Sequence, residues 1–375
     1  MKSPITNGYD RRIKRPHLQV EISHIFVPRC AADWTYAHHP HIVYFKNRLY
    51  AIWSSGRVHE DDLGQRVMIS SSEDFHHWTE PKALVGSLQG KHSELVLTAA
   101  GFYPNDDSLV AYFGQYEYQS EQIVSGVRKM EDKGHMDTCL RAVTTSDGEC
   151  WSDPVDLDLP IVPNHGPART STGRLIISGN MMFPYSDDMS GTGGWRKSGI
   201  YDPALESEVW DDSEALWRVK EHMGWPTVLC EGSWYETDDG RIRMLLRSNT
   251  EHLWVTESID DGATWTSPKE TLFTDNASKF HVGRLSDGRY YYVGCPDPQP
   301  RWKRNPLVLS LSEDGIRFDR HFILGNESFT AKFPGSYKGG DYGYPHSLVH
   351  DGYLYVVFSI CKERIAVMRT AIETI

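Results

Sequence analysis

A turn motif that recurs four times constrains the fold of this chain more than any other feature. Each copy places Ser shortly before Asp, then usually Gly, then an aromatic residue, and the copies are SEDFHHW (72–78), SDGECW (146–151), SIDDGATW (258–265) and SEDGIRF (312–318). In a tight turn between two strands, the Asp carboxylate accepts hydrogen bonds from backbone N–H groups and Gly supplies a positive φ. Because each copy follows a strand-like run, the motif predicts a repeated antiparallel sheet.

A second repeat interleaves with the first. It consists of a strand, a two-residue turn and a strand, and its copies begin near His41, Leu95, Pro167, Gly232, His281 and Pro345. A single hairpin cannot bury its own apolar face. Two hairpins side by side make a four-stranded blade, and a ring of blades is a β-propeller. The sequence therefore predicts an all-β fold, a β-propeller with six repeats.

The two ends of the chain predict how the ring closes. The last blade has three clear strands and ends in RIAVMRTA (364–371), while LQVEISHIFV (18–27) near the N-terminus can supply the missing strand. We therefore expect a single propeller domain over residues 1–375, closed by N- and C-terminal strands. Two β-sandwiches in tandem are the alternative, and it is disfavoured because the repeat runs across any midpoint boundary.

The charge and the N-terminal sequence narrow the classes of partner. The formal net charge of -12 disfavours nucleic acid, which needs a basic face. No apolar run is long enough to span a membrane. No signal peptide is visible at the N-terminus, so we expect a cytoplasmic protein or the mature form of a secreted one. An acidic substrate must then meet a local basic pocket.

Polar residues gather where the innermost strand of each expected blade begins. In a propeller these strands line the central channel, and their starts share one face with the ends of the second strands. That face collects TYAHHP (35–40), NHGPAR (164–169), CEGS (230–233), SKFHVG (278–283) and GYPHS (343–347). Convergence of His, Glu, Lys and Arg at one channel mouth predicts an active site there.

His165 and Tyr185 are the candidate proton-transfer residues. His165 enters an innermost strand at the channel mouth, although a turn histidine bonded to backbone beside Gly166 and Pro167 is an alternative. Tyr185 follows the end of a second strand in GNMMFPYSDD (179–188). A tyrosine donates a proton readily when a cation places its phenol, and an aromatic residue at the rim is the alternative.

Arg247, Arg169 and Glu231 are the candidate charged residues. Arg247 follows three apolar residues in MLLRS (244–248), so we expect it where the apolar core borders the channel mouth. A guanidinium buried there needs an anionic partner. Glu231 begins the strand whose hairpin partner ends in Arg247, so we expect the two to face each other. A structural salt bridge from either arginine to Glu231 or Asp239 is the alternative.

Further residues at the mouth are candidate substrate-binding groups. They are His39, Gln115, Arg169, Asn180, Lys279, His281, Tyr344 and His346. His38, His39 and His41 raise the question of a metal, but no carboxylate or further histidine lies nearby in the sequence. We therefore predict no metal ligand, and structural packing is the alternative for each binding residue.

The Asp-turn motif resembles the Asp-box, or BNR repeat, of the sialidase superfamily. CEGSWYETDDGRIRMLLRS (230–248) is similar to the sialidase blade in which a Glu precedes an arginine that binds the substrate carboxylate. Two elements depart from sialidases: FVPRC (26–30) stands where an Arg-Ile-Pro element is expected, and neither the acid Asp nor the nucleophilic Tyr is identified.

Longer phrases are similar to propeller enzymes that act at uronic acids. They are TYAHHPHIVYF (35–45), NHGPARTSTGRLIISGN (164–180), KFHVGRLSDGRYYYVG (279–294), NPLVLSLSEDG (305–315) and YGYPHSLVHDGYLYVVFS (342–359). These phrases resemble ulvan lyases, rhamnose-α-1,4-glucuronate lyases and related α-L-rhamnosidases. That resemblance implies seven blades and a His, Tyr and Arg machinery, which falls on His165, Tyr185 and Arg247. Glu231 stands where ulvan lyases place a tyrosine.

The resemblance and the channel residues together predict a polysaccharide lyase. In β-elimination an arginine stabilises the charge that develops at the uronate carboxylate, here Arg247. His165 and Tyr185 transfer the protons, and Arg169 and His281 hold the sugar. The expected reaction cleaves a rhamnose-α-1,4-glucuronate linkage and releases terminal rhamnose from arabinogalactan or gum-arabic-type glycans.

Two other classes of function remain open. A glycoside hydrolase, either an α-L-rhamnosidase or a sialidase-like enzyme, would use a pair of acidic groups of which Glu231 is one candidate. A non-catalytic carbohydrate-binding propeller would tolerate loss of His165. The expected partner in each case is an oligo- or polysaccharide bearing uronic acid. No cofactor is required, and a structural Ca²⁺ is left open.

Overall fold

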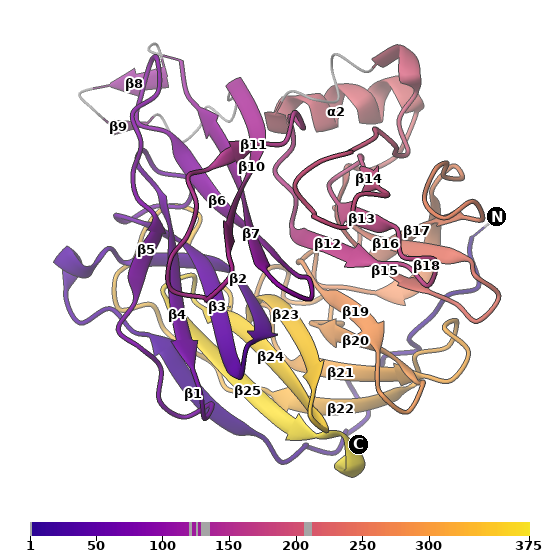
Figure 1. The fold of residues 1–375 in the computed structure, drawn as a ribbon. Helices are drawn as coiled ribbons and strands as arrows, with labels where there is room; N and C mark the ends of the chain where they lie inside the picture. Colours follow the sequence, from indigo (N-terminus) through magenta and orange to yellow (C-terminus); the bar gives the residue numbers. More distant parts are fainter. Residues whose placement is uncertain (1, 120–121, 125–126, 129–135, 206–211) are drawn as a thin grey trace.

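Six antiparallel sheets follow one another along the chain and stand in a ring (Figure 1). The computed structural model describes residues 2–119, 122–124, 127–128, 136–205 and 212–375, and the number of sheets refers to these residues. The innermost strand of each sheet contacts the next sheet along the chain, and the last sheet contacts the first. This arrangement confirms the predicted all-β propeller.

The first three blades come from the N-terminal half of the chain. The first is β2 (Tyr36–Phe45), β3 (Arg48–Gly56), β4 (Arg66–Ser72) and β5 (Lys82–Val85). The second is β6 (Val96–Pro104), β7 (Leu109–Glu117), β10 (Met136–Thr145) and β11 (Val155–Asp156). The third has the strands β12 (His165–Arg169), β13 (Leu175–Ser178) and β14 (Tyr185–Ser186).

The remaining blades each have four strands. The fourth is β15 (Leu229–Glu236), β16 (Ile242–Ser248), β17 (His252–Ser258) and β18 (Lys269–Thr274). The fifth is β19 (His281–Arg284), β20 (Tyr290–Gly294), β21 (Leu307–Ser312) and β22 (Arg320–Gly325). The sixth is β23 (Gly343–His350), β24 (Tyr353–Ile360), β25 (Arg364–Ala371) and β1 (Glu21–Phe26).

Two short additions lie outside the blades. The strands β8 (Ile123–Val124) and β9 (Val127–Arg128) pair with each other, and α2 (Asp212–Met223) precedes the fourth blade. Among the described helices, none is both long and apolar enough to cross a membrane. The described blades number six, as the repeats predict, in place of the seven that the resemblance to uronate-cleaving enzymes implies.

The chain ends meet in the sixth blade. β1 pairs antiparallel with β25, and an ion pair of 3.1 Å joins Arg369 to Glu21 across the two strands (Figure 1). Ahead of β1, Thr6 bridges to Leu272 and the backbone of His17 bridges to Ile323. The N-terminal segment therefore runs along the outer edges of the fourth and fifth blades before it completes the ring.

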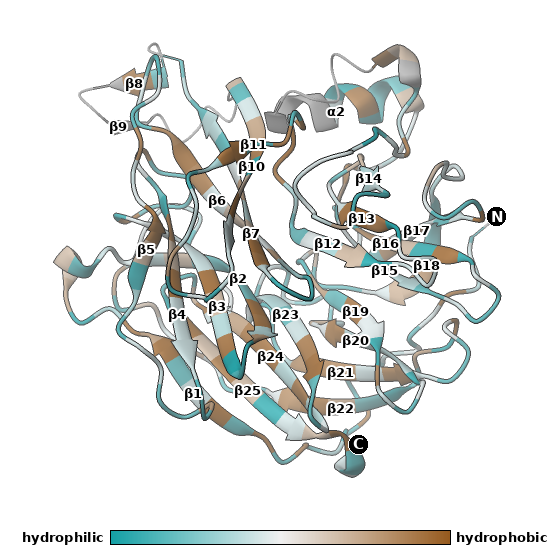
Figure 2. Cartoon of the chain, in the orientation of Figure 1, coloured by the Kyte–Doolittle hydropathy of each residue, from teal (hydrophilic) through white to brown (hydrophobic). Residues whose placement is uncertain are grey.

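Apolar side chains fill the spaces between the blades. Figure 2 shows the strands banded brown and teal, as expected for sheets whose faces are packed against neighbours. One core cluster spans the second, third and fourth blades and includes Tyr112, Phe183 and Met244. Others join the fifth blade to the sixth and the sixth to the first.

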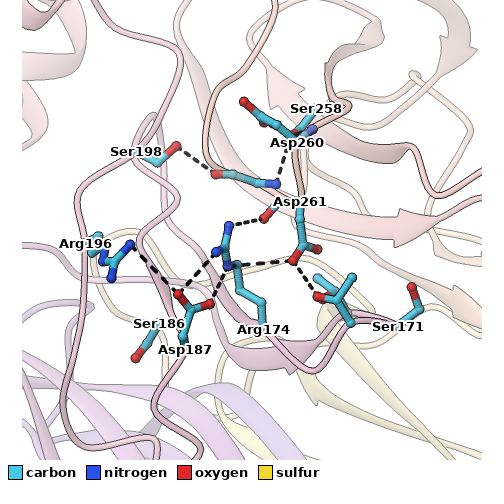
Figure 3. A network of polar contacts seen from close by, with 12 residues as sticks. Ser171, Arg174, Ser186, Asp187, Arg196, Ser198, Ser258, Asp260 and Asp261 are labelled. Carbon is cyan, nitrogen blue, oxygen red and sulfur yellow. Dashed lines mark hydrogen bonds and ion pairs between the residues drawn. The ribbon is translucent and has the colours of Figure 1, made fainter.

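The Asp-boxes have the predicted turn chemistry and also link blades. In the fourth blade, Ser258 Oγ donates to Asp260, whose carboxylate accepts the Thr264 N–H at 2.9 Å. The same turn reaches the third blade through Arg174, which lies 3.7 Å from Asp261 (Figure 3). The polar outer corner of one blade is thereby fastened to its neighbour.

The second and third blades approach so closely that glycine is required on both sides. A Cβ placed on Gly101 would lie 2.3 Å from the backbone nitrogen of Gly166, well inside contact distance. Gly101 also has a φ of +109°, which side chains other than glycine adopt only with strain. The glycine of the NHGPAR segment thus serves blade packing at the channel.

Candidate active site

A repeated β-bulge at the start of the innermost strands places the site residues. The pairing register shifts between His38 and His41 in β2, between Cys230 and Ser233 in β15, and between Gly343 and His346 in β23. The residue inside each bulge has a positive φ, namely 53° at His39, 50° at Glu231 and 50° at Tyr344. Positive φ is costly for these residue types, and such strain clusters at functional sites.

Tyr344, Glu231 and Arg247 form one hydrogen-bonded group. The Tyr344 hydroxyl donates to one carboxylate oxygen of Glu231. Arg247 Nη1 donates to the other oxygen at 2.7 Å and to the Tyr344 oxygen at 3.0 Å. Asn180 supports the group, because its side-chain oxygen accepts the Glu231 N–H at 3.1 Å. The phenol, the carboxylate and the guanidinium are therefore in direct contact.

Two further cations face the same phenol. The guanidinium carbon of Arg304 lies 5.0 Å from the centre of the Tyr344 ring, and Lys279 Nζ lies 5.8 Å from it. Lys279 Nζ, Arg304 Nε and Nη1, and Arg247 Nε are buried and have no hydrogen-bond partner among the described residues. Buried cationic donors without partners are costly, and these donors can bind an anion.

The electrostatics of the group follow from burial and proximity. Burial raises the pKa of Glu231, but the charge of Arg247 and hydrogen bonds from Arg247 and Tyr344 outweigh it, so the pKa lies below its usual value. Burial and the Glu231 charge raise the pKa of the Tyr344 phenol. Burial lowers the pKa of Lys279 to about 7, and Glu231 opposes the shift. The resting pair is thus a phenol beside a carboxylate.

Histidines close one side of the site. The ring centre of His38 lies 4.1 Å from that of Tyr344, and the centre of His39 lies 5.3 Å away. Hydrogen bonds to Ser359 at 2.7 Å and Ser54 at 3.1 Å fix the two rings. Burial, followed by nearby cations and histidine, lowers both pKa values, so the imidazoles are neutral near pH 7.

The arrangement can activate a nucleophile beside a bound anion. Glu231 accepts the hydrogen bond of the phenol and is placed to take its proton, which would convert Tyr344 into an attacking oxygen. Arg247 and Arg304 offer donors to a carboxylate in the same space. The side chains of Arg247 and Glu231 keep 15% and 10% of their surface exposed, so solvent reaches the group.

The structure brings several predicted residues together. Glu231, Arg247, Tyr344, Lys279 and His39 share this site, with Asn180 as a support. Arg247 forms an ion pair with Glu231, which was the structural alternative for this arginine. Its Nε has no partner among the described residues, so Arg247 can also bind a ligand.

Other predicted residues lie elsewhere, which corrects the expected grouping. Tyr185 is on β14, where Arg174 lies over its ring at 4.4 Å, so the cation beside this phenol is Arg174. Gln115 accepts a hydrogen bond from Arg141 at 3.2 Å. Arg169 is at the far end of β12 and donates to the Tyr103 hydroxyl at 2.9 Å.

His165, His281 and His346 belong to a second cluster, together with His41. The His165 ring centre lies 4.9 Å from that of His281 and 5.7 Å from that of His346. The His41 ring centre lies 4.9 Å from that of His346. His165 Nε2 donates to the Phe280 carbonyl at 3.1 Å, so its backbone bond is to another blade and not to its own turn. These rings lie together at the axis, tilted or edge-to-face to one another.

Sequence reasoning missed Arg304 and the role of Glu60. Arg304 precedes β21, the third strand of its blade, whereas the predicted mouth takes in only the starts of first strands and the ends of second strands. Glu60 accepts hydrogen bonds from Lys362 and, at 3.3 Å, from Tyr36. The RWKRNP segment (301–306), with three cations after a strand, is the signal in the sequence that points to Arg304.

Comparison with known families agrees with the Asp-boxes and the ring. Residues 47–356 match the family described as the BNR repeat-like domain. This chain belongs to that family. No curated protein sequence matches it.

Solved structures that share the BNR repeat-like fold include sialidases. A Dyadobacter fermentans protein of unknown function has a TM-score of 0.66 and 14% identity, over 94% of this chain and 99% of the other. A mutant NanB sialidase from Streptococcus pneumoniae has a TM-score of 0.64 and 13% sequence identity, and the match covers 96% of this chain and 71% of the sialidase. The Trypanosoma rangeli sialidase has a TM-score of 0.61 and 14% sequence identity, and the match covers 89% of this chain and 55% of the sialidase. At these identities the likeness establishes the fold alone.

Proposed function

We propose that this protein is a glycoside hydrolase that cleaves a glycan at a sugar bearing a carboxylate, with Tyr344 as nucleophile and Glu231 as its base. The observation that carries the proposal is the direct contact of the phenol with a carboxylate held by Arg247. Tyrosine replaces the usual carboxylate nucleophile in sialidases. The sialidase-like fold of the neighbours is consistent with the same chemistry.

The cations argue for an acidic sugar. Arg304, Arg247 and Lys279 carry buried donors that have no partner among the described residues. A bidentate guanidinium matches the planar geometry of a carboxylate. A sugar carboxylate seated against Arg247 and Arg304 would place the adjacent ring carbons close to the Tyr344 oxygen, because Arg247 Nη1 already touches that oxygen.

Elimination at a rhamnose-α-1,4-glucuronate linkage is the second candidate. Cations around one carboxylate would also acidify the C5 proton of a uronate, and Tyr344 with His39 beside it would offer the proton-transfer groups. The predicted assignment of proton transfer to His165 and Tyr185 has no support from the geometry, because neither contacts Arg247. This second candidate therefore rests on the same site as the first.

The products distinguish the two reactions. We expect the enzyme to release a saturated acidic sugar from model glycosides of sialic acid or of glucuronic acid that carries rhamnose on O4 as the leaving group for elimination, with no gain of ultraviolet absorbance. A product with a C4–C5 double bond conjugated to the carboxylate would instead establish elimination. Release from neutral glycosides at a comparable rate would contradict the acidic-sugar proposal.

The arginines provide the matching variants. Arg304→Lys and Arg247→Lys keep the charge but lose the planar pair of donors, and each should lower kcat/KM by about tenfold or more. Esterifying the substrate carboxylate should lower kcat/KM of the parent enzyme by a similar factor. The same change should lower kcat/KM of the variants little further. Additive losses would show that the arginines do not bind that carboxylate.

A further inference from the structure

The histidine cluster at the axis has the character of a metal site. His41, His165 and His346 each offer a ring nitrogen, and these atoms all lie within 4.8 Å of one another. They come from the first, third and sixth blades, so no local motif in the sequence joins them. Nitrogen ligands of a tetrahedral ion with bonds of about 2.0–2.1 Å lie roughly 3.3 Å apart, so side-chain shifts of about 1 Å would close the group.

Several ring nitrogens of the cluster are unsatisfied. Both ring nitrogens of His41 and Nδ1 of His165 are buried and have no hydrogen-bond partner within the part of the chain that the structure describes. Because His165 Nε2 donates to the Phe280 carbonyl, its Nδ1 holds the lone pair in the neutral ring. A carbonyl that orients a ligating histidine in this way is a usual companion of a metal site. Buried polar atoms otherwise find partners, so these vacant nitrogens call for a ligand.

The remaining contacts are compatible with a metal. The Ile42 N–H reaches His346 Nδ1 only at 3.4 Å, the long limit of a hydrogen bond, so little is lost if that nitrogen turns to a metal. The nearby His281 is fixed by Ser347 at 2.6 Å and lies 4.5 Å, centre to centre, from His346. It lines the same space without serving as one of the three ligands.

His165 and His346 of this cluster, together with His281, line a cavity of about 770 Å³. Ala168, Trp234, Glu236 and Arg284 line its outer part, and the histidines line its buried part. These outer residues lie towards the ends of the innermost strands, whereas Glu231 and Tyr344 lie at their starts. The cavity therefore opens on the propeller face opposite the candidate active site.

We propose that His41, His165 and His346 bind a divalent first-row transition metal ion, with an open coordination position towards this cavity. Neutral imidazoles suit zinc and its neighbours in the series, whereas Ca²⁺ and Mg²⁺ prefer oxygen ligands. Three histidines with an open fourth position are one arrangement of catalytic zinc sites. The open position would bind water or an oxygen-bearing ligand that enters through the cavity.

A second group of candidate ligands is less suited. His38, His39 and Glu60 also lie within 4.8 Å of one another. Glu60 is already paired with Lys362, and hydrogen bonds to Ser359 and Ser54 hold the two histidines. A cation there would displace an existing ion pair, so we assign the metal to the axial cluster.

Lys279 opposes a cation at the axial cluster. Its charge is among the causes that lower the pKa of His41 and His165, so it lies close enough to repel a metal ion. Replacing the ammonium by an uncharged chain of similar length removes that repulsion. Lys279→Met should therefore tighten metal binding, by about tenfold or more.

Zinc titration of the chelator-stripped protein tests the proposal. We expect one Zn²⁺ per chain at micromolar or lower dissociation constant, and a Co²⁺-loaded protein with the visible absorption of a four- or five-coordinate ion. His41→Ala and His165→Ala should each weaken Zn²⁺ binding at least about 100-fold. His321→Ala is the matched control, because His321 is also buried but is bonded to Ser310 and Asn7 away from the axis.

The outcomes are separable. Unchanged binding in His41→Ala, absence of binding in the parent, or loss of binding in Glu60→Gln would overturn the assignment. Circular dichroism reports whether each variant folds. If His165→Ala does not fold, the Co²⁺ spectrum of the parent and the affinities of His41→Ala and Lys279→Met still decide the question.

Discussion

The proposed reacting group consists of three side chains that lie on different blades or strands. Glu231 begins β15, Arg247 is near the end of β16, and Tyr344 is near the start of β23. The first two share a blade, so hairpin pairing predicted that they face each other. Tyr344 arrives from the sixth blade, and only ring closure brings its hydroxyl to Glu231.

Removing the Tyr344 hydroxyl tests its role at the residue scale. Tyr344→Phe should lower kcat on the order of 1,000-fold or more while leaving the fold intact, because a nucleophile acts in the transition state. Tyr342→Phe is the matched control, since this buried phenol lies two residues earlier in the chain and donates to Glu327 instead. Steady-state kinetics of both variants make the comparison, and equal losses would sink the nucleophile assignment.

Asp275 makes stability depend on pH. Burial raises the pKa of this carboxyl to about 7, although the Ser278 N–H and the Tyr292 hydroxyl, each at 3.0 Å, favour its charged form. Because the folded pKa exceeds the unfolded value near 4, the contribution to stability is full below about pH 4 and is lost as pH rises through about 7. Asp275→Asn should remove this loss.

Chemical denaturation at several pH values measures the effect. The free energy of unfolding of the parent should fall relative to Asp275→Asn by roughly 1–4 kcal/mol between pH 4 and pH 8. Parallel pH profiles for the two proteins would show that Asp275 does not titrate in this range.

At the scale of elements, the Asp-boxes and hairpins were sufficient to predict the blades. Their turn chemistry is local, so Ser258 and Asp260 form the expected contacts within a few residues of each other. The bulges were not predictable, because a positive φ at Glu231 or Tyr344 is imposed by packing at the axis and leaves no compositional mark. The same bulge in β2 sends His39 to Tyr344 and His41 to the axial cluster, although strict alternation predicts one face for both.

The close approach of two innermost strands predicts a large cost at Gly101. Gly101→Ala places a Cβ against the Gly166 backbone, whereas Gly173→Ala meets open space at a similar φ of +101°. Backbone strain alone should cost Gly173→Ala about 1–2 kcal/mol. At Gly101, overlap of the new Cβ with the Gly166 backbone should increase the loss of unfolding free energy by about 1–3 kcal/mol or more.

Urea denaturation of the two glycine variants isolates the contribution of the overlap. Equal losses of unfolding free energy would mean that the two blades separate without cost, which would contradict the close packing at the channel.

At the scale of the whole molecule, β1 closes the ring. Without it, β25 would expose an unpaired strand edge and Arg369 would lose Glu21. Deleting residues 1–27 should therefore lower cooperativity in thermal unfolding and promote association through the free edge. A peptide of residues 18–27 added in trans should restore part of the stability by pairing with that edge.

Size-exclusion chromatography and calorimetry of the truncated chain check this expectation. A monomer that unfolds at the temperature of the parent would show that the other five blades hold the ring without its closing strand.

The most direct measurement of the central claim is the identity of the residue that becomes glycosylated during turnover. A fluorinated glycosyl fluoride of sialic acid or glucuronic acid slows breakdown of a covalent intermediate, which peptide mass spectrometry then locates. We expect one adduct per chain, on the peptide that contains Tyr344, and none in Tyr344→Phe. Turnover of the parent glycoside with an unsaturated product, or an adduct on another residue, would contradict it.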